Sequence, residues 1–392
     1  MKKKLKRIIL LGTLIFIAVF CIYLFCQPIH IPTRLTAPYD IVIQRGTASI
    51  TAYLSDEKEI YVPDKILGMK VTYIEQDVFK HLGTNAVILH IPTSVCVARN
   101  LYDYQSKSYY TIWFNDVYFE KYAGEEKSIN ISEKVWERDV TIITTDSFYE
   151  TDIENIAIPD TITYIGGGAF YGCKNLKQIT LPPYLEKIET YTFKYSGIEK
   201  IEVPQSVAEI GYGAFSYSAL KEIKGLENVE YIDNCAFRGT PWEEDIEGDF
   251  VCIYDALHLY RGTESEVVLP ATTKAIRGAF CIDEGYNYPI KVTKVFIPES
   301  VTSISPKSFY GQKDMEVYIP KSVTAIGCND ATLPPEHAED IFKIGFGGVI
   351  ITTEGSPAEA YAIAQRIPYK IITEEEMQQE MENAIKKQNN PS

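Results

Sequence analysis

The chain has 392 residues, of which 46% are hydrophobic and 23% charged, and its formal net charge is −15. This composition excludes a disordered or collagen-like protein, and the length predicts two or three domains unless the chain is a repeat array. Five of its 38 Lys and Arg residues lie within the first seven positions, which leaves 33 against 53 acidic residues, a net charge of −20. A body this acidic is a poor partner for nucleic acid or anionic lipid.

The N-terminus differs in kind from the rest of the chain. A basic tip, from Lys2 to Arg7, precedes an uncharged apolar run at residues 8–26. As a helix this run spans about 28 Å, close to the hydrocarbon core of about 30 Å. Because no small-residue cleavage site follows, residues 1–26 predict a cytoplasmic tip and an uncleaved signal anchor, with a cleaved signal peptide as the alternative. We therefore expect a single-pass protein of the cell membrane with an extracellular body, or a secreted one.

The next segments lead into the body of the protein. Residues 27–38 contain three prolines, which predicts an extended spacer. The alternation from Tyr39 to Tyr53 predicts a hairpin that covers the open first coil. Residues 60–79 hold the first full copy of a pattern that then returns along the chain. We expect residues 39–373 to form one repeat body.

One pattern of about 22 residues dominates residues 156–237. Its conspicuous Phe residues lie 23, 22 and 22 positions apart. A period in the low twenties predicts a solenoid, because each unit buries its apolar face only by stacking on a neighbour. Short period-two runs such as 201–203 predict parallel strands, so the fold class is an α/β solenoid. The expected interior Phe positions are Phe79, Phe148, Phe170, Phe193, Phe215, Phe237, Phe280 and Phe309.

The period breaks at 99–140, 239–263 and 328–347, with a shorter break at 281–293. The first break is rich in Tyr and Trp, and we expect an irregular insertion with room for one degenerate coil. The second predicts an inserted hairpin that turns near Asp255.

A closing device follows the last repeat, at residues 355–373. Ser356, Pro357 and Glu359 supply an N-cap, a first helical proline and a capping-box acid, which predicts a helix at 357–365. A strand at 369–372 should complete this cap. The tail at 374–392 predicts a polar helix or a frayed end over 374–388.

The repeats resemble the BspA-like branch of the leucine-rich repeat family. The resemblance is carried by Ile156–Leu176, with Ile165-Gly166, Ala169-Phe170 and Cys173, and by the segments Gly239–Trp242 and Gly355–Ala362. It implies a leucine-rich-repeat solenoid of the kind found in exported bacterial surface proteins used for adhesion, and the apolar run at residues 8–26 adds an N-terminal transmembrane helix to this fold. It brings no catalytic residues with it, and fold alone does not fix function.

Together with the predicted anchor, the resemblance implies a non-catalytic, extracellular, membrane-anchored protein that binds an unknown protein or glycan partner at the cell surface. A structural envelope protein that self-associates is the alternative, and a surface enzyme is a more distant one.

The sequence shows no constellation for catalysis, cofactor or metal binding. The five histidines have no metal-ligand spacing, and no nucleophile-elbow, Walker or zinc-protease motif occurs. The six cysteines outside the anchor contain no CxxC pair, and Cys173 and Cys235 lie inside repeat motifs, so we expect buried free thiols. We assign no catalytic, cofactor-binding or metal-binding residue, and no cofactor.

Outward strand positions are the better place to search for a partner site. Stacking in order places Lys200 beside Glu222 and Glu202 beside Lys224, pairs that we interpret as setting the register. The same outward position holds Val268, Phe296 and Tyr318 in three consecutive strands, which predicts an exposed apolar stripe, with cover by the neighbouring insertions as the alternative.

The aromatic insertion supplies the other candidate partner-binding residues. Tyr109, Tyr110 and Trp113 are the ones we single out. Packing inside the insertion is the alternative to recognition.

Overall fold

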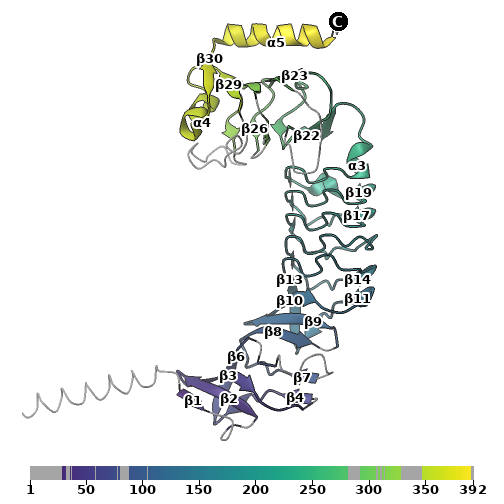
Figure 1. Cartoon of the computed structure of the whole chain (residues 1–392), viewed down its shortest axis with the longest axis vertical. Helices are drawn as coiled ribbons and strands as arrows, with labels where there is room; N and C mark the ends of the chain where they lie inside the picture. The colour runs from purple at the N-terminus through teal and green to yellow at the C-terminus, as the bar shows by residue number, and fades with distance from the viewer. Residues whose placement is uncertain are drawn as a thin grey trace, which may run out of the picture. The chain divides into compact units, whose positions relative to one another are not determined.

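The computed structural model describes residues 29–31, 36, 38–57, 59–76, 78–79, 88–103, 105–280, 292–305, 308–309, 311–312, 314–327 and 347–389 (Figure 1). The predicted anchor and nearly all of the 328–347 excursion lie outside these residues. The chain divides into two compact units, Met1–Leu185 and Glu186–Ser392. Among the described residues, none of the helices combines the length and apolar character needed to cross a membrane.

The first unit is built on an 11-stranded sheet. Its N-terminal hairpin pairs β2 (Tyr39–Gln44) with β3 (Thr47–Tyr53), and β3 continues in parallel onto β6 (Met69–Ile74). The predicted hairpin at the start of the body is therefore confirmed. The other strands of this sheet are β1 (Ile29–Ile31), β5 (Lys65–Ile66), β8 (Val97–Asp103), β9 (Ser108–Trp113), β10 (Asp116–Tyr122), β12 (Lys134–Val135), β13 (Arg138–Ile143) and β15 (Tyr164–Ile165).

Residues 99–140 are regular, contrary to the expected irregular insertion. Strands β8, β9 and β10 form an antiparallel meander inside the parallel stack. One solenoid coil then follows, in which β11 (Ser128–Asn130) pairs in parallel with β14 (Asn155–Ala157). These residues form strands because their side chains alternate between the core and solvent. Tyr110 and Ile112 on β9, and Val117 and Phe119 on β10, are the buried residues at every second position. The high aromatic content therefore belongs to strands.

The first unit also contains a two-stranded parallel pair on another side of its coils. It joins β4 (Glu59–Tyr61) to β7 (Ile88–His90).

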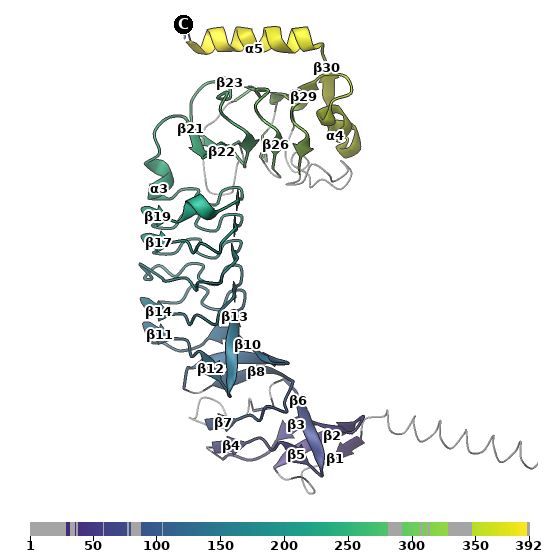
Figure 2. The same cartoon turned by 180° about the vertical axis from the view of Figure 1, so that it is seen from behind.

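The coils of the second unit carry short strands at two points of the turn, and at each point the strands fall into two separate sheets (Figure 2). The strands of the first kind were predicted from the sequence, whereas those of the second kind were not. The strands of the first kind are β17 (Lys200–Glu202), β19 (Glu222–Lys224), β23 (Glu266–Val268), β25 (Lys294–Phe296), β27 (Glu316–Tyr318), β29 (Val349–Thr352) and β30 (Tyr369–Ile371). Those of the second kind are β16 (Lys187–Ile188), β18 (Glu209–Ile210), β20 (Tyr231–Ile232), β24 (Ala275–Ile276), β26 (Ser303–Ile304) and β28 (Ala325–Ile326).

The predicted hairpin in the 239–263 break is confirmed. It pairs β21 (Phe250–Ile253) with β22 (Ala256–Tyr260) around a turn at Tyr254 and Asp255. Strand β22 then pairs in parallel with β24, so the return strand of the hairpin takes the place of a coil.

The helices of the second unit begin at residues that satisfy their free backbone donors. Helix α4 (Pro357–Gln365) has Ser356 as N-cap, with the Glu359 carboxylate accepting the Gly355 N–H at 2.6 Å, and it confirms the predicted cap. The tail is also helical, as α5 (Glu374–Asn389), and its first turn is closed by Thr373 and Glu376. The short helices are η2 (Leu226–Asn228) and α3 (Pro241–Glu244).

Stacked Phe rings form the axis of the core. Phe215 lies between Phe193 and Phe237, with ring centroids 5.3 and 5.5 Å apart and the rings nearly parallel. Phe119, Phe148 and Phe170 continue in the same way in the first unit, at 4.9 and 5.2 Å. These spacings are close to the roughly 4.8 Å between neighbouring strands, because each coil supplies one ring at the same point of its turn, and strand β10 supplies Phe119 at the end of the column.

The predicted register of the outward charges is confirmed. Lys200 is opposite Glu222 and Glu202 is opposite Lys224, and Lys200 Nζ lies 2.7 Å from Glu222 Oε2. Cys173 and Cys235 are buried free thiols, as expected, whereas Cys281 and Cys328 lie outside the described residues. Burial raises the pKa of Cys173 to about 11, so this thiol is an apolar packing group.

Substituting Phe215 by Ala should lower the free energy of unfolding by about 3–5 kcal/mol, because it removes a fully buried ring between two others. The matched control is Tyr184→Ala, since Tyr184 is an aromatic residue that is 67% exposed. Urea denaturation followed by circular dichroism checks both variants. A loss below about 1 kcal/mol for Phe215→Ala would contradict the central role of the ring stack.

Candidate functional site

The candidate site is the solvent-facing side of the sheet in the first unit. Tyr73 is opposite Val97 and Val97 is opposite Trp113, while Tyr118 is opposite Ile142 and Ile142 is opposite Tyr164. Their sequence neighbours, such as Ile74, Ile112 and Ile165, point into the core. We call the following set the outer aromatic row: Tyr73, Val97, Trp113, Tyr118, Ile142 and Tyr164.

The most exposed part of this surface is the turn between β9 and β10. Trp113 and Phe114 are 40% and 60% exposed, and their rings meet edge to face at 5.7 Å. The Arg99 guanidinium lies 5.8 Å from the Trp113 ring centroid. Trp and Arg are the residue types that contribute most to binding energy in protein interfaces.

The backbone at this turn is strained. Phe114 has a φ of 57°, in the left-handed region that bulky residues rarely adopt. A large apolar side chain is thus held in solvent at a conformational cost, although Gly or Asn would relieve it. Fourteen other described residues besides glycine have a positive φ, among them Leu67, Trp136 and Tyr217, so this conformation is a common feature of the turns of this chain.

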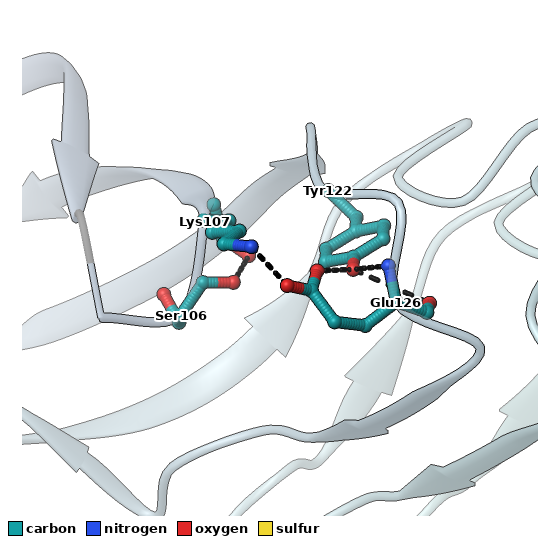
Figure 3. Close-up of polar contacts among 5 residues, drawn as sticks. Ser106, Lys107, Tyr122 and Glu126 are labelled. Carbon is teal, nitrogen blue, oxygen red and sulfur yellow. Dashed lines mark hydrogen bonds and ion pairs between the residues drawn. The ribbon is translucent and has the colours of Figure 1, made fainter. Parts of the chain in front are cut away.

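A polar cluster holds the opposite end of the meander in place (Figure 3). The Lys107 ammonium and the Tyr122 hydroxyl both reach the Glu126 carboxylate, with 2.5 Å from Tyr122 Oη to Glu126 Oε2. The Tyr122 hydroxyl also accepts the Glu126 N–H at 2.9 Å. The hydrogen bond from Lys107, followed by that from Tyr122, lowers the pKa of Glu126 to about 2. Its carboxylate is therefore ionised at neutral pH and fixes the two loops together.

The predicted aromatic residues of the insertion have different positions. Trp113 is exposed on the row, and Tyr109 is half-buried against Tyr102 at 4.9 Å. Tyr110, in contrast, is fully buried between Phe119 and Trp136, so a partner cannot reach it and its prediction as a contact residue is wrong. The reason is the strand period: Tyr110 occupies an inward position and Trp113 an outward one.

Sequence reasoning missed Phe114, Arg99 and most of the outer aromatic row. The sequence did contain a signal for the row. In these coils an aromatic residue directly precedes an Ile that points into the core, as in Tyr73-Ile74 and Tyr164-Ile165. The outward positions predicted from the sequence, such as Val268 and Phe296, lie on a different set of strands.

The predicted apolar stripe is continuous but not exposed. Val268, Phe296 and Tyr318 are opposite one another as predicted, and the Phe296 and Tyr318 rings stack at 4.3 Å. However, Phe296 and Tyr318 are only 1% and 6% exposed. Their cover is helix α5, through Met377 and Ala384, so neither exposure nor cover by the insertions is correct.

Side chains that can titrate are scattered through the described residues. No group of three or more His, Cys, Asp or Glu residues there could hold a metal ion. Glu59 accepts hydrogen bonds from Tyr61 at 2.7 Å and from His90 at 2.9 Å, on the exposed side of β4 and β7. The hydrogen bond from Tyr61, followed by that from His90, lowers the pKa of Glu59. Solvent screens this group, and we interpret it as a cross-strand contact.

Two buried groups near the hairpin of the second unit have strongly shifted pKa values. Burial raises the pKa of Glu243 to about 7, against the opposing effect of the Arg238 guanidinium. Its carboxylate accepts the Gly239 N–H at 3.0 Å in front of α3. Burial also lowers the pKa of His258 to about 3, assisted by Arg277. His258 is thus a neutral core residue at physiological pH.

Residues 141–247 and 282–330 match the family model described as the BspA type leucine rich repeat region, in six copies. No curated protein matches the chain significantly.

Several solved structures are similar to the chain over most of its length. A leucine rich cell surface protein from Faecalibacterium prausnitzii A2-165 is 18% identical, with a TM-score of 0.32, and the match covers 86% of this chain and 98% of that one. A leucine-rich repeat protein from Bacteroides ovatus ATCC 8483 is 15% identical, with a TM-score of 0.32 and 88% and 98% covered. The pneumococcal vaccine antigen PcpA is 14% identical, with a TM-score of 0.30 and 89% and 99% covered.

Glu243→Gln tests the buried carboxyl of the second unit. The folded chain holds this proton up to about pH 7, whereas the unfolded chain loses it near pH 4.5, so this group's contribution to stability falls as pH rises between these values. The variant should therefore gain roughly 1–3 kcal/mol relative to the wild type between pH 4.5 and pH 8. Urea denaturation at both pH values measures the difference.

Glu244→Gln is the control for that experiment, because Glu244 is the exposed neighbour of Glu243. It should behave like the wild type at both pH values. An equal response of the two variants would contradict the assignment.

The matched ranges contain the buried Phe148, Phe170, Phe193, Phe215, Phe237 and Phe309, and also the Gly-Thr-Pro-Trp segment at 239–242. Residues 141–247 and 282–330 of the chain therefore carry repeats of the BspA type.

Proposed function

We propose that this chain is a non-catalytic binding protein of the cell surface, which engages a protein or glycan partner through the outer aromatic row and the adjoining turn at Trp113 and Phe114. The observation that carries the proposal is the exposed Trp113–Phe114 pair next to Arg99. Aromatic rings supply contact area for apolar side chains and for the C–H faces of sugars alike.

The rigidity of the sheet supports this proposal. The rings of the row stand on strands whose other faces are fully buried, and the Lys107–Glu126–Tyr122 cluster holds the far end of the meander. Their positions are therefore set before a partner arrives, which lowers the entropy lost on binding. The row consists of two apolar groups, Tyr73–Val97–Trp113 and Tyr118–Ile142–Tyr164, because Trp113 is opposite Asp116 and Tyr118 is opposite Thr111. Exposed apolar groups of this kind commonly mark an interaction site.

The proposal includes anchoring of the protein through residues 8–26, with the repeat body outside the cell. Deleting residues 1–26 should move the protein from the membrane fraction to the soluble fraction. Mass spectrometry of the natural N-terminus then separates the two routes: an intact Met1 end supports the anchor, and a processed end indicates secretion.

Trp113→Ala should weaken binding to the partner tenfold or more, because it truncates the largest exposed ring of the surface. A screen of the repeat body against cell-surface proteins and cell-wall glycans, followed by titration of the ligand found, gives the dissociation constants. Tyr184→Ala, which also removes an exposed aromatic ring, is the matched control and should bind as the wild type.

Binding that is unchanged by Trp113→Ala, and also by Phe114→Ala, would remove this surface from consideration. A screen without any ligand would count against the function as a whole.

A further inference from the structure

The covered stripe of the second unit has the form of a site that accepts a helix. The outward residue of four consecutive strands is apolar there, whereas the same strand position holds exposed Glu202 and Lys224 in the preceding coils. We call the four side chains the docking face: Val268, Phe296, Tyr318 and Ile351. Coil stacking does not require apolar residues on the outside of a solenoid. Their presence is therefore explained by the segment that packs on them.

Helix α5 fits the docking face through one side only. Met377, Met381 and Ala384 follow one another at i, i+4 and i+7, the spacing with which an amphipathic helix binds a groove. Figures 1 and 2 both show α5 alongside the strands of this sheet. The remainder of the helix is mostly exposed and polar.

Charged contacts at both ends fix the direction of the helix. Lys321 Nζ lies 2.7 Å from Glu374 Oε1 at its start, and Lys387 Nζ lies 3.0 Å from Glu266 Oε2 at its end. The Gln388 side-chain oxygen also accepts the Val268 N–H at 3.3 Å. A helix running the other way would place like charges together at both ends.

The helix can leave without opening the solenoid. The cluster that contains Phe296, Tyr318, Met377 and Ala384 is separate from the main core cluster of this unit, to which α5 contributes no residue. A polar helix of 16 residues with so little buried surface belongs to the least stable part of a protein, where local opening is most frequent. Only Ile372 and Thr373 connect it to β30.

We propose that the docking face is a helix-binding site that also accepts α5 from a second copy of this chain, so that two copies exchange their C-terminal helices. A second copy presents the apolar spacing and both charged ends that the face already binds in cis. The tether gives the cis helix an effective concentration of roughly millimolar order. Exchange therefore takes place where copies are crowded, as domain swapping does in general.

Two full-length charge-reversal variants test the exchange. The first variant reverses the charges at the two ends of α5 by Glu374→Lys and Lys387→Glu. The second reverses the partner charges beside the docking face by Lys321→Glu and Glu266→Lys. Each variant alone places like charges together at both ends of its own helix, whereas reciprocal exchange between the two restores all four ion pairs. All four residues lie at the solvent-accessible rim of the contact, so the core is untouched.

We expect an equimolar mixture of the two variants, carrying different tags in the same detergent, to form at least tenfold more heterodimer than either variant forms homodimer. Native mass spectrometry and capture by one tag measure this ratio. The control is the chain with all four substitutions. Its own helix and docking face again carry opposite charges at both ends, so it should be as monomeric as the wild type.

Three results would overturn the proposal. The first is a mixture with no more dimer than the four-substitution control. The second is dimer of equal amount in each variant alone, which would indicate unspecific contact. The third is capture of a different helical protein by the helix-reversed chain without pairing between the copies, which would assign the docking face to another occupant.

Discussion

Stacking of coils is the constraint on which the rest of this structure depends. A single coil of about 22 residues has an apolar face that it cannot cover, so each one must supply the same residue types at the same points as its neighbours. The Phe column shows this most directly, because rings such as Phe193, Phe215 and Phe237 lie on one another at 5.3 and 5.5 Å. Regular hydrogen bonding between short parallel strands then follows from the stacking.

The same constraint leaves the outward positions free, and the chain uses them differently from place to place. In the first unit, the ladder next to the inward Ile residues has Tyr73, Ile142 and Tyr164 outside. In the second unit, the corresponding positions include Lys187 and Glu209, which form an ion pair at 2.9 Å. Stacking is satisfied in both cases, and in the second unit an aromatic residue, Tyr231, also occupies this position opposite Glu209.

Predictions from the sequence were accurate wherever the residues that decide the structure are close in the sequence or repeat along it. The period predicted the solenoid, Ser356 and Pro357 predicted the start of α4, and Lys200 and Glu222 predicted the register. They failed at 99–140, where aromatic density was taken for irregularity. The position of Tyr110 inside the core depends on Phe119 and Trp136, strands away, and no local pattern indicates that pairing.

The sequence by itself thus determined the repeat, its caps, the inward residues and the fold class, because coil stacking is encoded anew in every unit. Only the tertiary structure decided which outward residues meet solvent. Val268, Phe296 and Tyr318 are apolar and lie at outward strand positions, yet α5 buries Phe296 and Tyr318 and partly covers Val268. Burial of an outward residue depends on a segment far along the chain, here Met377 and Ala384, and its approach is fixed by contacts that no repeat pattern contains.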